Sequence, residues 1–257
     1  MKNRFCVGMF CLFSLSVLAP SATILWDTSH GVADSGAYRP SRYSGYYQDL
    51  ANDLYDAGFT LNTTSTGFVS ADLSGTDILV VASPCAINSQ YSAAEITKIA
   101  AFVSAGGGLL VLGDQFYSTV EPVAGRFGFS FASSFISPND VYTSSFVDTH
   151  PVFENIDQIY LYAAEEVSGA GIIGRQEDTD KGLVAAGLFG SGRVVAIGDS
   201  TLWTVNPNVI DHSYDRADNA QFALNVFTHL ADTTYIPEPA TLILLAAGTI
   251  VLRRSRR

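Results

Sequence analysis

Cysteine, histidine and methionine are scarce in this sequence, with three Cys, four His and two Met among 257 residues. Cys6 and Cys11 lie in an apolar stretch near the start, so Cys85 is the only thiol of the body, which can form no internal disulfide. No His or basic residue lies near Cys85 in the sequence, which favours a buried structural thiol over a reactive one. The histidines lack HExxH or comparable metal-ligand spacing, and no G-x-S-x-G elbow occurs. These absences exclude a disulfide scaffold and the known signatures of a zinc protease or an α/β-hydrolase.

Basic residues are few outside the two ends of the chain. There are 14 Lys and Arg against 25 Asp and Glu, and four of the Arg residues fall within the last five positions. An acidic body repels phosphate backbones, so we expect no nucleic-acid partner. It attracts cations, and the acidic loops 176–182 and 211–219 raise calcium as an alternative, although neither has EF-hand spacing. We therefore expect no metal and no cofactor, and interpret both loops as solvated surface, with Asp218 capping the last helix.

The first apolar run, residues 5–22, follows Lys2 and Arg4 and ends in small residues. A basic start, a short apolar core and a small-residue exit are typical of a secretory signal peptide, which we place at residues 1–22. An uncleaved N-terminal anchor is the alternative, but the run is short for a membrane span of about 20 residues.

The C-terminal tail, "IPEPATLILLAAGTIVLRRSRR", joins a Pro-Glu-Pro triplet, a short apolar run and a basic end. It resembles the PEP-CTERM sorting signal of Gram-negative bacteria. The resemblance implies a short transmembrane segment at about 237–252 within a signal covering 232–257, with an exosortase-type membrane protease and the secretion machinery as partners. It also implies an exported protein, anchored transiently in the inner membrane and destined for the cell surface or extracellular matrix. The residues that carry it are Pro237, Glu238, Pro239, Arg253, Arg254, Arg256 and Arg257.

Between these ends, short apolar runs alternate with amphipathic stretches. The runs 23–26, 77–83 and 108–114 indicate strands, and 44–59, 92–108 and 218–231 indicate helices, the second with a capping box of Ser92 and Glu95. Continuous apolar strands separated by amphipathic helices predict a parallel sheet covered on both faces. In the second half, 182–199 predicts a β-hairpin, 130–153 an irregular insertion, and 158–167 a strand.

The order of these segments, from "ILWDTSHG" through "DILVVAS" and "ITKIAAFVSAGGGLLVLGD" to "GRVVAIGDS" and "DNAQFALNVFTHL", resembles the class I glutamine amidotransferase-like superfamily. The match is with its non-catalytic branch, which includes GIFT-type domains, and covers residues 23–231. It implies a flavodoxin-like α/β fold. The superfamily's enzymes place a nucleophilic Cys on a strand-to-helix elbow, where this chain has Asp114 or Gln115, whereas Cys85 follows a different strand. We therefore expect no amidotransferase activity and assign no catalytic residue.

Polar residues follow the predicted parallel strands at their carboxyl ends, where open α/β sheets bind ligands. If the strands pair as expected, these residues share one edge and form a binding rim. The alternative is that the three Asp residues cap helices or bind loop backbone. The candidates are Asp27, Ser29, His30, Ser83, Asp114, Gln115, Asp199 and Ser200.

We thus expect an exported, non-catalytic binding or structural module. Extracellular polysaccharide is the expected ligand only through the resemblance of the tail. Two alternatives remain: a hydrolase acting from the rim at Asp27, Ser29 and His30, whose side chains are those of a triad, and a protein assembly module, which an exposed apolar patch would favour.

Overall fold

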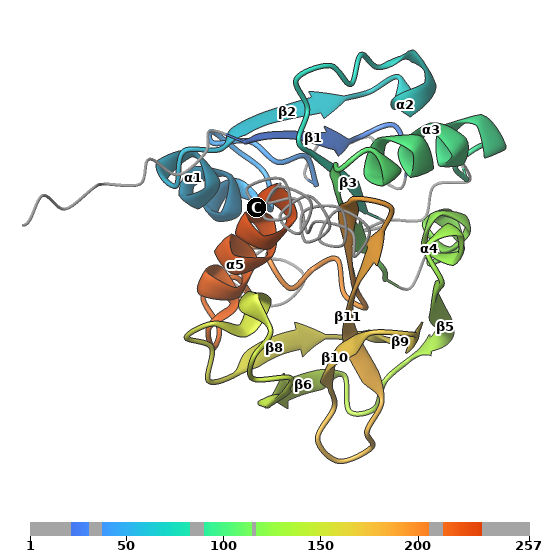
Figure 1. Cartoon of the computed structure of the whole chain (residues 1–257). Coiled ribbons are helices and arrows are strands. Elements are labelled where there is room, and N and C mark those ends of the chain that lie inside the picture. Colours follow the sequence, from blue (N-terminus) through green and yellow to red (C-terminus); the bar gives the residue numbers. More distant parts are fainter. Residues whose placement is uncertain (1–21, 31–37, 83–89, 115–116, 206–212, 233–257) are drawn as a thin grey trace, which may run out of the picture.

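An eight-stranded sheet forms the centre of the molecule (Figure 1). The computed structural model describes residues 22–30, 38–82, 90–114, 117–205 and 213–232. Five neighbouring strands of the sheet run parallel in the order β2-β1-β3-β4-β12, as in a flavodoxin-like fold, which confirms the predicted fold class. Their bounds are β1 Thr23–Asp27, β2 Thr60–Thr64, β3 Ile78–Ala82, β4 Gly108–Leu112 and β12 Gly192–Ile197.

Three antiparallel strands extend the sheet beyond β12: β11 (Gly182–Phe189), β10 (Ile172–Arg175) and β7 (Ser145–Phe146). β11 and β12 form the predicted hairpin, which turns at Gly190 with a φ of +62°. A Cβ at Gly190 would also lie 2.6 Å from the Ser104 carbonyl oxygen, so this turn requires glycine for both conformation and space.

Helices cover both faces of the sheet. On one face pack α1 (Gln48–Asp56) and α5 (Asn219–Ala231), and on the other α2 (Gly67–Ser70), α3 (Ala93–Ser104) and α4 (Glu121–Arg126). All side chains of β3 and β4 are buried, because both faces of these central strands are covered. Trp26 and Trp203 are fully buried, so they belong to the core.

The insertion at 130–153 contains more regular structure than its sequence indicates. β5 (Phe129–Phe135) pairs with β9 (Glu165–Gly169), and β6 (Asp140–Thr143) pairs with β8 (Ile159–Tyr162). The strand predicted at 158–167 is two strands, because the chain turns at Ala163 with a φ of +49°. The pairing partners lie 16 residues or more away in sequence, so the local Ser-rich and Pro-rich pattern does not reveal them. Short 3₁₀ turns occur at Tyr117–Thr119 and Pro151–Phe153.

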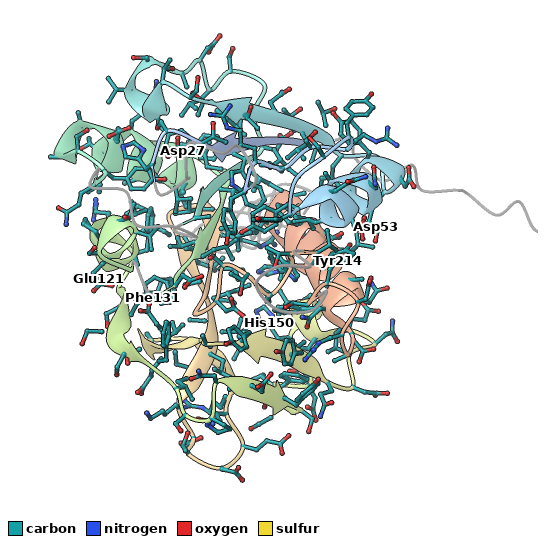
Figure 2. All side chains as sticks on the ribbon, turned by 180° about the vertical axis from the view of Figure 1, so that it is seen from behind. Asp27, Asp53, Glu121, Phe131, His150 and Tyr214 are labelled. Carbon is teal, nitrogen blue, oxygen red and sulfur yellow. The ribbon has the colours of Figure 1, made fainter. Side chains whose placement is uncertain are left out.

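Side-chain hydrogen bonds tie the insertion and the segment before α5 to helices of the core, and Figure 2 labels the residues involved. Glu121 of α4 accepts a hydrogen bond from the Phe131 backbone N–H at 2.8 Å. The Tyr214 hydroxyl donates to the Asp53 carboxylate of α1 at 2.7 Å. The insertion and the segment before α5 are therefore each bonded to a helix that covers the sheet.

The prediction of a transmembrane helix is corrected by the structure. In the described ranges no helix combines the length and apolarity needed to cross a membrane. The longest, α5, has 13 residues, or about 20 Å at 1.5 Å per residue, against a hydrocarbon core of about 30 Å. The segments interpreted as a signal peptide (1–22, of which only Ala22 is described) and as a PEP-CTERM signal (232–257, of which only Asp232 is described) otherwise lie outside the described residues, and no described residue supports either interpretation.

Candidate functional site

The described candidates lie at or just after the ends of β1, β4 and β12, at the carboxyl edge of the parallel strands. They form two clusters, because β3 separates β1 from β4 in the sheet. Asp27, Ser29 and His30 belong to the first cluster, and Asp114, Asp199 and Ser200 to the second. With strands spaced about 4.8 Å apart, the two clusters are separated laterally by about 10 Å. The candidates Ser83 and Gln115, like Cys85, lie outside the described residues.

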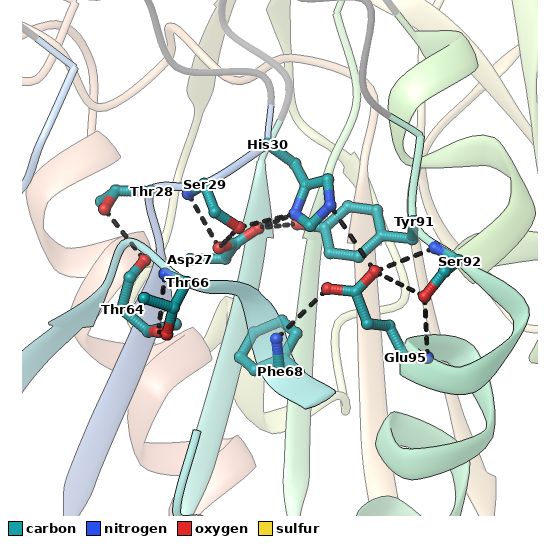
Figure 3. Close-up of polar contacts among 10 residues, drawn as sticks. All are labelled: Asp27, Thr28, Ser29, His30, Thr64, Thr66, Phe68, Tyr91, Ser92 and Glu95. Atoms are coloured by element: carbon teal, nitrogen blue, oxygen red, sulfur yellow. Dashed lines mark hydrogen bonds and ion pairs between the residues drawn. The ribbon is translucent and has the colours of Figure 1, made fainter. Parts of the chain in front are cut away.

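Asp27 is the centre of the first cluster (Figure 3). Its carboxylate is fully buried and accepts four hydrogen bonds. Oδ1 accepts from the backbone N–H and the hydroxyl of Ser29, at 2.9 and 2.6 Å. Oδ2 accepts from the Tyr91 hydroxyl at 2.6 Å and lies 2.7 Å from Nδ1 of His30. Both oxygens are thus fully engaged within the protein.

His30 lies between two carboxylates. Its Nδ1 contacts Asp27, its Nε2 lies 3.6 Å from the Glu95 carboxylate, and its ring stacks on Tyr91 with centroids 4.1 Å apart. Burial acts to lower the pKa of His30, but the hydrogen bond and charge of Asp27 and the charge of Glu95 outweigh it, so the pKa is raised. Burial acts to raise the pKa of Asp27, but hydrogen bonds from His30, Ser29 and Tyr91 outweigh it, so that pKa is lowered. The two shifts favour a buried ion pair.

Glu95 connects this pair to two helices. Its Oε2 accepts hydrogen bonds from the backbone N–H and hydroxyl of Ser92, which confirms the predicted capping box at the start of α3. Its Oε1 accepts from the Phe68 backbone N–H of α2 at 3.2 Å. The capping box was visible in the sequence, but the roles of Tyr91 and Glu95 beside His30 were missed. No sequence signal reveals them, since Tyr91 lies 64 residues from Asp27.

The geometry differs from that of a hydrolytic triad. In a triad the Ser hydroxyl and the Asp carboxylate contact opposite nitrogens of the imidazole, so that the ring can take the Ser proton. Here Ser29 Oγ and Asp27 Oδ2 both lie at Nδ1, at 2.8 and 2.7 Å. The other nitrogen faces Glu95, and the Ser29 hydroxyl donates its hydrogen bond to Asp27. His30 is therefore not placed as a general base for Ser29.

A substitution at the closely packed Gly67 tests whether this network stabilises the fold. Gly67 has a φ of +72°, and a Cβ there would lie 2.4 Å from Glu95 Oε1. We expect Gly67→Ala to lower the free energy of unfolding by about 2–3 kcal/mol, through backbone strain and displacement of Glu95. Gly75→Ala is the matched control, because Gly75 has the same φ and no atom within 4 Å of its added Cβ. Equal losses in urea denaturation of the two variants would show that the Glu95 contact contributes nothing.

The second cluster brings three carboxyl groups from different strands together. Asp199 Oδ1 accepts from the backbone N–H and hydroxyl of Thr201, and its Oδ2 accepts from the Tyr162 N–H. The alternative of local backbone bonding therefore holds for Asp199. Burial together with the charge of Asp114 raises the pKa of Asp199 to about 7. Asp114 accepts a hydrogen bond from the Ser200 hydroxyl at 2.6 Å.

Glu165, on β9, is the third acid, and sequence reasoning missed it because it does not follow a parallel strand. It is 1% exposed, and its Oε2 has no hydrogen-bond partner among the residues that the structure describes. Burial, with the charges of Asp114 and Glu121, raises the pKa of Glu165 to about 8. At neutral pH this carboxyl group is therefore mostly protonated and uncharged.

The acidic loops do not assemble a metal centre among the residues described. In those ranges no group of three or more His, Cys, Asp or Glu side chains is placed to hold a metal ion. Asp218 occupies the N-cap position of α5, but its carboxylate accepts hydrogen bonds from the backbone of Asp157 and Gln158 instead of capping the helix. Asp180 lies beside Arg175, 3.6 Å away.

Solved structures with the same fold have low sequence identity to this chain. The N-terminal domain of mmIFT52 is 13% identical, with a TM-score of 0.62 over 81% of this chain and 97% of that one. A cytoplasmic protein from Salmonella typhimurium is 12% identical, with a TM-score of 0.54 over 81% and 98%. A β-galactosidase from Rahnella sp. R3 is 17% identical, with a TM-score of 0.53 over 82% of this chain and 30% of that one. These likenesses establish the fold alone.

Sequence comparison identifies the family directly. No curated protein matches the sequence significantly. The model of a domain of unknown function, DUF4350, matches residues 44–227, which include α1, the strands of the central sheet other than β1, and most of α5. The chain therefore belongs to the DUF4350 family.

Proposed function

We propose that this domain is a non-catalytic module that binds a polar ligand, with polysaccharide as the class of ligand. The non-catalytic role is supported by one observation: Ser29 and Asp27 both contact the same imidazole nitrogen, Nδ1 of His30. This arrangement leaves Ser29 without a base, and His30 is held between two acids that stabilise its charged form. The residue types of a triad are present, but their bonds serve to join β1 to α2 and α3.

The second cluster supports the same reading. A catalytic carboxyl pair must reach a substrate, whereas Asp199 and Glu165 are each 1% exposed and Asp114 is 6% exposed. Asp199 is also bonded to the backbone through both oxygens. These buried acids support the fold, and we place the ligand contacts on more exposed side chains.

Two measurements on the purified protein test this proposal. We expect no hydrolysis of p-nitrophenyl esters, p-nitrophenyl glycosides or glutamine above the uncatalysed rate, and retention of the protein on insoluble polysaccharide in a co-sedimentation assay. Turnover that disappears in both Ser29→Ala and His30→Ala would favour the hydrolase alternative. Absence of retention on every polysaccharide would contradict the binding role.

A further inference from the structure

An open groove lies at the free edge of the sheet, between α1 and β2. The positions of α1 and β2 can be followed in Figure 1. It has a volume of about 600 Å³, within the range of small-molecule sites, roughly 300–1,000 Å³. Its walls are the segment 40–43, the last turn of α1 at Tyr55, and residues 61–63 of β2. The groove is separate from both carboxylate clusters, which lie at the ends of β1, β4 and β12.

Three planar side chains line one part of this groove. The Arg42 guanidinium lies over the Tyr55 ring, 4.6 Å from its centroid, and its Nε donates to the Asn52 side chain at 3.3 Å. The Tyr43 side chain is 90% exposed and makes no hydrogen bond or ring contact with any described residue. Its backbone N–H donates to the Ser41 hydroxyl, which fixes the turn that presents it. An unsupported aromatic ring in a groove offers a flat face for a ligand.

The other wall offers backbone hydrogen-bonding groups. Within the described ranges β2 is an edge strand whose one pairing partner is β1, and its Thr60 N–H and Thr64 carbonyl bond toward β1. Because alternate residues of an edge strand point their backbone groups away from the neighbour, those of Leu61 and Thr63 face outward at the groove. The Leu61 carbonyl also accepts a long hydrogen bond from the Tyr55 hydroxyl at 3.5 Å, which leaves its second lone pair for a ligand. Only two outward residues are available, which is too short an edge for the addition of a peptide strand.

The charges around the groove do not favour a charged ligand. Arg42 is its only cationic side chain among the described lining residues, and its Nη2 lies 3.7 Å from the Asp56 carboxylate. An acidic ligand would have to compete with Asp56 in a protein of formal net charge −11. A cationic ligand would meet Arg42 itself. The lining therefore suits a neutral molecule that has both hydroxyl groups and an apolar face.

We propose that this groove binds a neutral oligosaccharide, with a pyranose ring stacked on Tyr43 and its hydroxyl groups bonded to Arg42 and the β2 edge. The inference rests on the proposed binding role and names its site. The C–H groups on one face of a pyranose pack against an aromatic ring, while its hydroxyls both donate and accept hydrogen bonds. Arg42 supplies donors in one plane, and the edge backbone supplies donors and acceptors.

The test uses calorimetric titration of the full chain with neutral trisaccharides of β-linked glucose, galactose, mannose and N-acetylglucosamine. We expect at least one to bind, and Tyr43→Ala to weaken it by at least about tenfold, whereas Tyr43→Phe keeps the ring face and stays within about threefold. Tyr142→Ala is the matched control, since Tyr142 is 46% exposed and lies on β6, outside the groove. Its binding should equal that of the unaltered protein.

Two further titrations decide between ligand classes. A trisaccharide of uronic acids and a ten-residue extended peptide should both bind more weakly than the neutral sugars, and tighter binding of either overturns the proposal. If a neutral trisaccharide binds Tyr43→Ala as tightly as the unaltered protein, the groove is not the site. If the protein is retained on polysaccharide but binds no trisaccharide, the groove proposal is likewise wrong. In both cases the proposed binding role remains. If the protein is not retained on any polysaccharide and binds no trisaccharide, both the binding role and the groove proposal are wrong.

Discussion

Asp27→Asn should lower the free energy of unfolding by about 3 kcal/mol at pH 6 to 7, because it removes the buried counter-charge of His30. The amide keeps one acceptor but brings two donors to a site where Ser29 and Tyr91 already donate. Urea denaturation followed by circular dichroism measures the change. The sign opposes that expected for a cluster of repelling carboxylates, where neutralising one acid would stabilise the protein.

Asp72→Asn is the matched control for this prediction. Asp72 accepts hydrogen bonds from the backbone N–H and hydroxyl of Ser74, as Asp27 does from Ser29, but it is exposed and no described His is paired with it. We expect a much smaller loss than for Asp27→Asn, because solvent screens an exposed side-chain turn. Similar losses in the two variants would mean that the His30 ion pair adds nothing to stability.

The pH profile of Asp27→Asn gives a second readout. The raised pKa of His30 provides stability that is fully present below the ordinary His pKa of 6.5 and is lost as pH rises through the folded value. The lowered pKa of Asp27 provides stability that is present above 3.8 and is lost as pH falls through its folded value. Without the carboxylate, the loss of stability above pH 6.5 should become shallower.

The parts of the fold that depend on local patterns were predictable from the sequence. The capping box of Ser92 and Glu95 and the hairpin at Gly190 involve neighbours in the chain. The parallel strands were visible because strands buried on both faces are apolar throughout. The same continuity allowed the prediction that Asp27, Asp114 and Asp199 lie at one edge of the sheet.

The bonds made by these residues were not predictable. Tyr91 donates a hydrogen bond to Asp27, which lies 64 residues away in sequence. Glu95, besides capping α3, contacts Phe68 and His30 because α2 and α3 pack together. Glu165 lies on β9, whose partner β5 comes from the segment that reads as irregular. The burial of Glu165 depends on long-range packing, which the neighbouring residues in the sequence do not indicate.

Glu165→Gln should stabilise the protein at high pH and change it little at pH 5. Burial and the nearby Asp114 and Glu121 raise the pKa of Glu165 from 4.5 to about 8. The stability linked to its bound proton is therefore fully present below pH 4.5 and is lost as pH rises through 8. The unaltered protein should lose on the order of 3 kcal/mol from this group between pH 5 and pH 9. Gln matches the protonated acid in shape and cannot ionise.

Melting temperatures of the unaltered protein and Glu165→Gln, measured at pH 5 and at pH 9, separate this effect from a general change in packing. The raised pKa of Asp199, about 7, acts in the same direction, so the variant should retain part of the slope. Glu166→Gln is the matched control, because Glu166 neighbours Glu165 on β9 but its side chain is 35% exposed and lies 4.0 Å from Lys181. Its pH profile should follow the unaltered protein. A parallel shift of the Glu165→Gln curve at both pH values would mean that Glu165 does not hold its proton in the folded state, and that its unpartnered oxygen is tolerated as a buried charge.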